Sequence, residues 1–194
     1  MILGDLDSLN PNVRAYYQSK HVPIVQEACQ NSTDLDKCLR HIADNNHSSN
    51  DVIVVGSLGG RVDHGFATLQ SLVKAEQLGV PSLKPELVLL TPQNVSFVLK
   101  PGHNRIHTPL KEGKLGKSVG IIPLGQRAVI TTTGLEWDVT NWETGFGGNV
   151  STSNHVVADS VTVHVRPLEG SGETSTGVLF TIELAEELKA ADGW

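Results

Sequence analysis

The chain of 194 residues has only two cysteines and lacks any apolar stretch long enough to cross a membrane. Two thiols, Cys29 and Cys38, do not make the disulfide framework of small secreted domains, so we expect a reducing, cytosolic setting. Basic residues are also scarce, with 15 Lys and Arg against 21 Asp and Glu and a net charge of -6. A mildly acidic chain is not expected to bind the phosphate backbone of nucleic acid. The length allows one large domain or two small ones.

Two aspartates separated by one residue follow a short apolar run at the start of the chain, in Ile2-Leu3-Gly4-Asp5-Leu6-Asp7-Ser8. On an extended segment, side chains at i and i+2 point the same way, and ligands of open α/β sheets gather beyond the carboxyl ends of strands. Two neighbouring carboxylates repel each other unless a cation lies between them, which favours Mg²⁺. The alternative is a solvated turn, because Gly, Asp and Ser are ordinary turn formers.

Strand and helix patterns alternate in the first half of the chain. Pro11 to Lys20 predicts a short helix with proline in its first turn, and His21 to Gln26 predicts a strand. Two further apolar runs, Asp51 to Gly56 and Glu86 to Thr91, also predict strands. The run from Asp51 is continuous and β-branched, which is typical of a parallel strand covered on both faces.

A capped helix is predicted between the strand at His21 to Gln26 and the strand at Asp51 to Gly56. Ser32 or Thr33 can accept a backbone N–H at its start, and the apolar residues that follow recur at intervals of three and four. Asp34 and Lys37 then lie in the first turn, where an acid suits the positive end of the helix dipole.

A glycine-rich turn, Gly56 to His64, follows the β-branched strand and leads into another helix. Glycines let the backbone approach an anion, and a helix N-terminus offers free N–H groups. The spacing matches neither a P-loop nor a dinucleotide fingerprint, so Arg61 and Asp63 carry the phosphate-site interpretation. A guanidinium suits phosphate oxygens, and an acid suits a metal or an attacking hydroxyl. The alternative is an ordinary turn with a surface ion pair.

Beyond about Gln93 short β runs separated by turns replace the helical periodicity, which suggests a sandwich or barrel. We therefore divide the chain into an α/β domain at 1–93 and an all-β domain at 94–194. Gly134 to Val139 places Trp137 in a tight strand, where the indole can stack on a planar heterocycle or lie in the core. Phe146 to Asn154 is rich in hydroxyl and amide groups that can form hydrogen bonds with the edge of such a ring. The predicted strands of this half are 95–99, 118–123, 128–133, 161–165 and 178–184.

Five motifs occur in one order: Gly-Asp-Leu-Asp-Ser, Gln-x-x-Thr-Asp-x-x-Lys-Cys-Leu, Gly-x-x-Gly-Gly-Arg-x-Asp-His, Gly-Leu-x-Trp and Val-Ser-Thr-Ser-Asn. Together they resemble thiamin pyrophosphokinase of the eukaryotic type, from the first residues to about Leu184. The resemblance implies a Rossmann-like parallel-sheet α/β catalytic domain followed by a β-sandwich. It also implies a homodimer with active sites between subunits and transfer of pyrophosphate from ATP to thiamin, which releases AMP.

The resemblance further implies roles for individual residues. The residues implied to be catalytic are Asp5, Asp7, Asp34, Lys37, Arg61 and Asp63. Mg²⁺ would be bound by three of these acids: Asp5, Asp7 and Asp34. The ATP phosphates would be contacted by Gln30, Thr33, Lys37 and Arg61. Trp137 would stack on the thiamin pyrimidine in the neighbouring subunit's active site, and the residues near it would be Ser151, Ser153 and Asn154. Asp63 is a candidate base for the thiamin hydroxyl.

Members of this family carry a longer segment before the first motif, with strands and a glycine-containing nucleotide loop. We therefore expect an N-terminally truncated chain with reduced stability and weak ATP binding, because the strand that ends at Asp5 would have an open edge. Two alternative functions stay open. One is a metal-dependent phosphohydrolase that uses the same acids with water as nucleophile, although such an enzyme has no need of Trp137. The other is a non-catalytic thiamin-binding product.

Overall fold

The computed structural model describes residues 1–45, 51–75, 87–168 and 177–189, and its contacts divide the chain into two compact units. Unit 1 comprises Met1–Asp51 and Arg61–Glu86, and unit 2 comprises Val52–Gly60 and Leu87–Trp194. The boundary expected after residue 93 stays a prediction. Within the described ranges, no helix is both long and apolar enough to span a bilayer.

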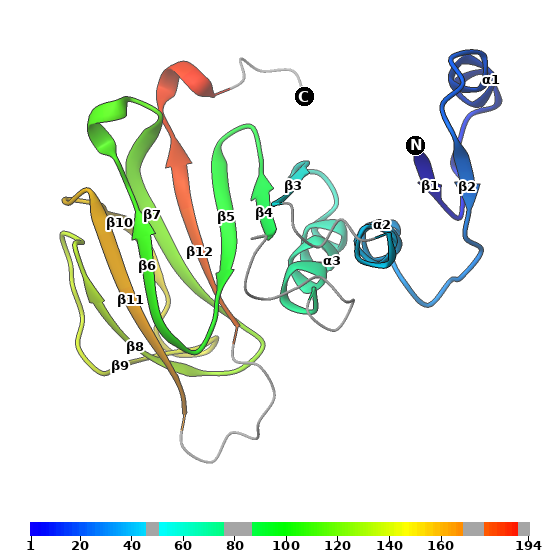
Figure 1. Cartoon of the computed structure of the whole chain (residues 1–194). Coiled ribbons are helices and arrows are strands. Elements are labelled where there is room, and N and C mark those ends of the chain that lie inside the picture. Colours follow the sequence, from blue (N-terminus) through cyan, green and yellow to red (C-terminus); the bar gives the residue numbers. More distant parts are fainter. Residues whose placement is uncertain (46–50, 76–86, 169–176, 190–194) are drawn as a thin grey trace. The chain divides into compact units, whose positions relative to one another are not determined.

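Unit 1 begins with a strand, a helix and a second strand, as predicted. β1 (Ile2–Gly4) pairs in parallel with β2 (Ile24–Gln26), and α1 (Pro11–Ser19) connects them. α2 (Asp34–Asp44) contacts β1 and also contacts α3 (Val62–Val73) (Figure 1). The parallel pairing brings the end of β1 next to the start of α2, where the first two motifs lie.

A capping box at Thr33 fixes the start of α2. Thr33 Oγ1 accepts the backbone N–H of Asp36 at 3.1 Å, and Asp36 Oδ2 accepts the backbone N–H of Thr33 at 3.3 Å. The sequence allowed either Ser32 or Thr33 as the cap. The structure selects Thr33 because the acid that completes the box stands three residues after it.

Unit 2 is a β-sandwich of a six-stranded sheet, in the order β10-β7-β12-β5-β4-β3, and a four-stranded sheet, in the order β6-β11-β8-β9 (Figure 1). Its core draws on both sheets, with Ile121 and Phe180 from one and Ile130 and Val163 from the other. The strands are β3 (Val52–Val55), β4 (Leu87–Leu90), β5 (Asn94–Leu99), β6 (Gly102–His107), β7 (Leu115–Leu124), β8 (Ala128–Thr133), β9 (Trp142–Thr144), β10 (Ser151–His155), β11 (Ser160–Pro167) and β12 (Gly177–Leu184). Two short 3₁₀ helices, η1 (Leu110–Glu112) and η2 (Glu186–Leu188), complete it.

The five strands predicted for the second half are confirmed, and β6, β9 and β10 were missed. β10 has the sequence Ser-Thr-Ser-Asn-His, which shows no alternation of apolar and polar residues. β6 contains a single large apolar residue, Ile106, which lies between polar neighbours. These strands form because they pair with neighbouring strands, and the local pattern of apolar and polar residues does not predict such pairing.

The single Rossmann-like parallel sheet expected for residues 1–93 is not confirmed in the described residues. Parallel pairing occurs in β1–β2 and in β3–β4, but β4 also pairs antiparallel with β5 and so joins the sandwich. The expectation that β3 is covered on both faces is wrong, because Ile53 and Val55 are 61% and 62% exposed at the sheet edge. β-branched residues favour a strand whichever of its faces is covered.

Candidate active site

Four predicted site residues meet where β1 ends and α2 begins. Lys37 Nζ donates a hydrogen bond to Asp34 Oδ1 at 2.9 Å and lies 3.8 Å from Asp5 Oδ2. The Lys37 side chain is fully buried, and Gln30 Nε2 lies 3.4 Å from Asp5 Oδ2. We call Asp5, Gln30, Asp34 and Lys37 the acid–lysine cluster. It joins two motifs that are about 25 residues apart along the chain.

Gly4 allows these two motifs to approach each other closely. A Cβ atom at this position would lie 2.8 Å from the carboxyl carbon of Asp34, which is closer than real Cβ atoms come to other groups. With glycine there, the backbone N–H of Asp5 donates to Asp34 Oδ1 at 3.2 Å. The glycine in the first motif therefore makes room for the acid of the second.

The charges of the cluster stabilise one another. The hydrogen bond to Asp34 raises the pKa of Lys37, the charges of Asp34 and Asp5 raise it further, and burial opposes them. The pKa of Asp5 is lowered, first by the backbone N–H of Asp7, which donates to Asp5 Oδ1 at 3.2 Å, and also by the charge of Lys37. At neutral pH Lys37 is therefore positively charged and Asp5 negatively charged.

The expected Mg²⁺ site of Asp5, Asp7 and Asp34 is not formed as a three-carboxylate group. No set of three or more His, Cys, Asp or Glu side chains in the described part of the chain is placed to hold a metal ion. The Lys37 ammonium bridges Asp5 and Asp34, and Leu6 has a φ of 62°, so the chain turns between Asp5 and Asp7. The donor chemistry still fits Mg²⁺, which commonly binds through one or two carboxylates together with substrate phosphates.

Asp36 is a buried acid whose role the sequence pattern did not predict. Its carboxylate accepts hydrogen bonds from Ser71 Oγ at 2.6 Å and Lys74 Nζ at 2.6 Å, besides the backbone N–H of Thr33. Burial alone would raise the pKa of Asp36, but the bonds from Lys74, Ser71 and Thr33 together lower it. These contacts tie the start of α2 to α3. The capping-box spacing was visible in the sequence, whereas partners 35 and more residues away were not.

Replacing Asp36 with alanine should lower the free energy of unfolding by about 2–3 kcal/mol, because Ser71 and Lys74 lose a buried acceptor and the capping box is broken. Urea unfolding followed by circular dichroism measures this loss. Asp44→Ala is the matched control, since this acid is exposed at the other end of the same helix and should change stability by less than about 0.5 kcal/mol. Equal midpoints for the Asp36 variant and the wild type would refute the role of Asp36.

Arg61 and Asp63 lie at the start of α3 and bind each other. Arg61 donates two hydrogen bonds to the Asp63 carboxylate, at 3.1 Å and 2.5 Å, and both side chains are largely exposed. Ser71, which contacts α2, is about 12 Å farther along the helix. The structure thus pairs these two residues with each other and does not join them to the acid–lysine cluster. The Arg61 bond also lowers the pKa of Asp63, which weakens it as a base.

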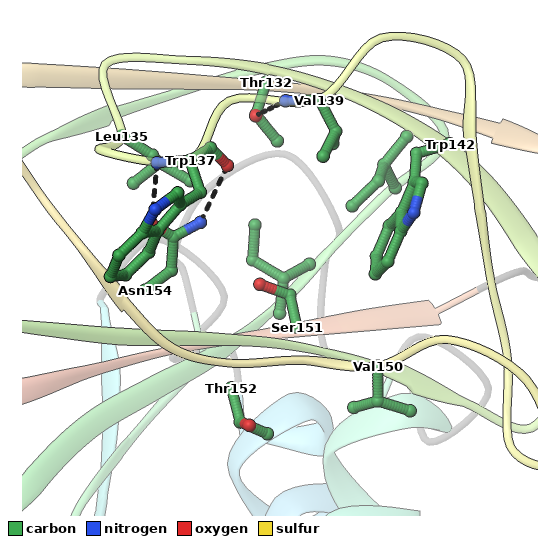
Figure 2. Close-up of a pocket in the computed structure, with 11 residues that line it drawn as sticks. Thr132, Leu135, Trp137, Val139, Trp142, Val150, Ser151, Thr152 and Asn154 are labelled. Carbon is green, nitrogen blue, oxygen red and sulfur yellow. Dashed lines mark hydrogen bonds between the residues drawn. The ribbon is translucent and has the colours of Figure 1, made fainter.

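Unit 2 contains a cavity of about 220 Å³ whose lining comes from both sheets (Figure 2). Figure 2 shows Trp137 and Trp142 on either side of it, with Ser151 between them. Three of the four residues expected near thiamin line the cavity: Trp137, Ser151 and Asn154. The remaining lining residues are Ile121, Ile130, Thr132, Leu135, Val139, Trp142, Val150 and Thr152. A cavity lined by both apolar and polar side chains, with an indole and hydroxyl groups, suits a planar heterocycle.

Trp137 lies on a turn, so the tight strand predicted for Gly134 to Val139 is wrong. In this segment only Leu135 makes a bridge, to Val156, and the Trp137 side chain is 55% exposed. The interpretation of Trp137 as a core residue is therefore excluded. Gly134 has a φ of 94°, and a Cβ there would lie 2.6 Å from the carbonyl oxygen of Ser160. The turn thus requires glycine three residues before the tryptophan.

A β-bulge in β10 explains why Asn154 lines the cavity and Ser153 does not. Ser151 pairs with Ile121 and Asn154 pairs with Val119, so three steps along β10 match two steps along β7. Regular alternation from Ser151 would turn Ser153 toward the cavity and Asn154 away from it. The extra residue reverses this order, and Asn154 is buried while Ser153 is exposed with a φ of 56°.

Comparison with known proteins gives one consistent result. The family model described as "Thiamin pyrophosphokinase, catalytic domain" matches residues 1–82, and the one described as "Thiamin pyrophosphokinase, vitamin B1 binding domain" matches residues 103–167. Thiamine pyrophosphokinase 3 of Oryza sativa subsp. japonica is 36% identical over 174 residues, which cover 85% of this chain and 61% of the relative. Thiamine pyrophosphokinase 1 of Arabidopsis thaliana is 33% identical over 190 residues, covering 95% of this chain and 65% of the relative.

Solved structures with a similar fold include thiamin pyrophosphokinase from Candida albicans, with a TM-score of 0.77 and 22% identity, over 94% of this chain and 73% of that one. The yeast thiamin pyrophosphokinase structure gives a TM-score of 0.76, also at 22% identity, over 94% of this chain and 68% of that one. At this identity the likeness shows a shared fold. The chain spans less than two thirds of the length of the rice and Arabidopsis relatives.

Proposed function

This chain belongs to the thiamin pyrophosphokinase family, and we propose that it transfers pyrophosphate from ATP to the hydroxyl of thiamin, which gives thiamin diphosphate and AMP. The observation that carries this proposal is that each matched region contains a candidate binding site of its own. The acid–lysine cluster lies within residues 1–82, and the Trp137 side of the cavity lies within residues 103–167. One region can bind phosphate groups and the other a heterocycle.

Lys37 is the central residue of the proposed phosphate site. Its position is set by Asp34 and Asp5, and a buried ammonium whose pKa is raised keeps its charge throughout the neutral range. A fixed positive charge stabilises the negative charge of a transferring phosphoryl group without reorganisation during the reaction. Gln30, Thr33 and Arg61 are the further ATP contacts that we propose.

We propose Mg²⁺ as the metal, held by Asp5, Asp7 and Asp34 together with the substrate phosphates. The support is the chemistry of the donors, since carboxylate oxygens are the ligands that Mg²⁺ prefers. When bound, the ion neutralises charge on the phosphates. The pKa of Asp5 is lowered, first by the hydrogen bond from the backbone N–H of Asp7, so its carboxylate carries the negative charge that binds a cation in the neutral range.

The cavity is proposed to take one ring of thiamin. At about 220 Å³ it is smaller than the pockets that enclose whole drug-sized ligands, so the rest of the molecule would lie outside it. Trp137 would stack on the pyrimidine, and Ser151 and Asn154 lie on the same cavity wall. Ser153 is exposed and does not line this cavity, so its proposed role near thiamin has the least support.

The proposed reaction is an in-line displacement. The thiamin hydroxyl oxygen forms a bond to the β-phosphorus of ATP, the bond from this phosphorus to the oxygen shared with the α-phosphate breaks, and AMP leaves. The hydroxyl proton passes to a base, for which Asp63 stays a prediction although its pKa is lowered. A loose transition state needs little help in removing this proton, so positioning and charge neutralisation carry most of the catalysis.

The proposal is tested by incubating the protein with ATP, MgCl₂ and thiamin and separating the nucleotides by chromatography. We expect AMP and no ADP, and we expect AMP only when thiamin is present. AMP formed at an equal rate without thiamin would favour the phosphohydrolase alternative. The homodimer, the cytosolic location and the Rossmann-like sheet stay predictions that this assay does not address.

A further inference from the structure

We propose that Asn154 is a positioning residue, which fixes the backbone of Trp137 and leaves ligand contact to the indole. This differs from the expectation that Asn154 lies against thiamin. The inference deepens the proposed function, on which it rests for the identity of the ligand. We call the hydrogen bonds between the Asn154 side chain and the Trp137 backbone the clamp. The clamp exists in the protein without ligand, so it can be tested without ligand.

Both backbone polar groups of Trp137 bond to the one side chain of Asn154 (Figure 2). The backbone N–H of Trp137 donates to Asn154 Oδ1 at 3.2 Å, and Asn154 Nδ2 donates to the carbonyl oxygen of Trp137 at 2.9 Å. This pair of bonds runs in opposite directions, as in a β ladder, and holds the peptide groups on both sides of the Trp137 Cα. These bonds fix the backbone at Trp137 and thereby the direction in which its Cα–Cβ bond points.

Asn154 has little bonding capacity left for a ligand. A primary amide has two acceptor sites and two N–H donors. Oδ1 also accepts the backbone N–H of His155 at 2.8 Å, so three of the four possibilities are used within the protein. The residue is 5% exposed. Because Asn154 is buried and most of its hydrogen bonds are made within the protein, its role is structural.

Asp138 also binds the backbone of this turn. Its Oδ1 accepts from Thr132 Oγ1 at 2.9 Å and from the backbone N–H of Leu135 at 3.2 Å, and its Oδ2 accepts from the backbone N–H of Gly134 at 3.0 Å. Trp137 thus sits between two side chains that bind the backbone around it. These bonds restrain the backbone of the turn in the absence of ligand.

The exposed indole of Trp137 has few packing contacts to hold it, so the hydrogen bonds to its backbone matter. More than half of the Trp137 side chain is exposed, and its aromatic neighbour, the His155 ring, is tilted at a centroid distance of 5.2 Å. Packing alone therefore constrains it weakly. A ligand that had to order this side chain would lose binding free energy, whereas a pre-ordered indole avoids that loss. The β-bulge that turns Asn154 inward is what makes the clamp possible.

Amide hydrogen exchange of the unmodified protein, followed by NMR without ligand, tests the clamp directly. We expect the Trp137 amide to exchange about a hundredfold more slowly than an unstructured amide, because opening it requires breaking the bond to buried Asn154. Exchange at the rate of an unstructured amide would overturn the proposal. This measurement needs no variant and does not depend on activity.

Variants test what the clamp does for the indole. In a Trp142→Phe, Trp194→Phe background Trp137 is the only remaining tryptophan of the three, so acrylamide quenching reports on it alone. In this background Asn154→Ala should raise the quenching constant about twofold. In the protein with all three tryptophans it should raise the KM for thiamin about tenfold and leave the KM for ATP unchanged. Asn154→Asp keeps both accepted bonds and loses the donated one, so it should give a smaller change in the same direction.

Asn149→Ala is the control, because this asparagine also bonds a backbone carbonyl, that of Glu143, and does not line the cavity. It should leave both quenching and the KM for thiamin unchanged. If Asn154→Ala raised the KM for thiamin with unchanged ligand-free quenching, Asn154 would be a direct contact and the proposal would be overturned. Altered quenching in a protein that has no thiamin turnover would support the clamp and contradict the proposed function.

Discussion

Lys37→Met is expected to lower kcat for thiamin diphosphate formation by about a thousandfold. Methionine has a similar length and no charge, so the variant removes the cation that the phosphates would meet. It also leaves Asp5 and Asp34 close together without the ammonium that bridges them. Their repulsion would then push the start of α2 away from the end of β1. Steady-state kinetics with saturating thiamin and ATP measures the loss.

The control for this variant is Lys20→Met, because Lys20 is exposed at the end of α1 and belongs to neither proposed site. It should keep wild-type kinetics. Circular dichroism and the urea midpoint of both variants show whether they are folded. A folded Lys37→Met protein with kcat within tenfold of the wild type would exclude Lys37 as the central phosphate-binding residue.

Trp137→Ala is expected to lower kcat/KM for thiamin by about 10- to 100-fold, mainly through a higher KM, since stacking of a base on an aromatic side chain contributes about 1–3 kcal/mol. The indole is exposed at the cavity, so its removal leaves no void in the core and should change the urea midpoint little. Trp137→Phe keeps a smaller ring and should lie between the alanine variant and the wild type. The KM for ATP should stay unchanged in both.

Phe146→Ala provides the comparison for Trp137→Ala. Phe146 is also a large exposed aromatic residue of unit 2, 64% exposed, but it does not line the cavity. Its loss should leave kcat/KM for thiamin at the wild-type value. Equal effects of the two alanine substitutions would mean that general exposure of aromatic surface, and not the cavity, determines thiamin binding.

Local sequence signals predicted the parts of the site that lie within one element. The cap at Thr33 placed Asp34 and Lys37 in the first turn of a helix, and the structure confirms that placement. The end of β1 was predicted from a short apolar run that stops at Gly4. The contact between Asp5 and Lys37 then follows from parallel pairing of β1 with β2, which places the start of α2 beside the end of β1.

Features that depend on distant partners could not be predicted. Asp36 is buried because Ser71 and Lys74 reach it from α3, and nothing near Asp36 in the sequence identifies these partners. The bulge in β10 depends on its register against β7 and left no signal in a strand of polar residues. Two acids at i and i+2 suggested one direction for both side chains, but the left-handed conformation of Leu6 turns the chain between them. Each of these corrections concerns tertiary pairing or backbone conformation.

The central proposal is that this chain moves an intact pyrophosphate group from ATP to thiamin. A ³¹P NMR time course of the reaction with ATP, MgCl₂ and thiamin tests it most directly, because every phosphorus product is seen at once. The account predicts that the resonances of AMP and thiamin diphosphate grow in equal amounts while those of ATP decline. Growth of ADP, or of free phosphate or pyrophosphate in place of thiamin diphosphate, would contradict it.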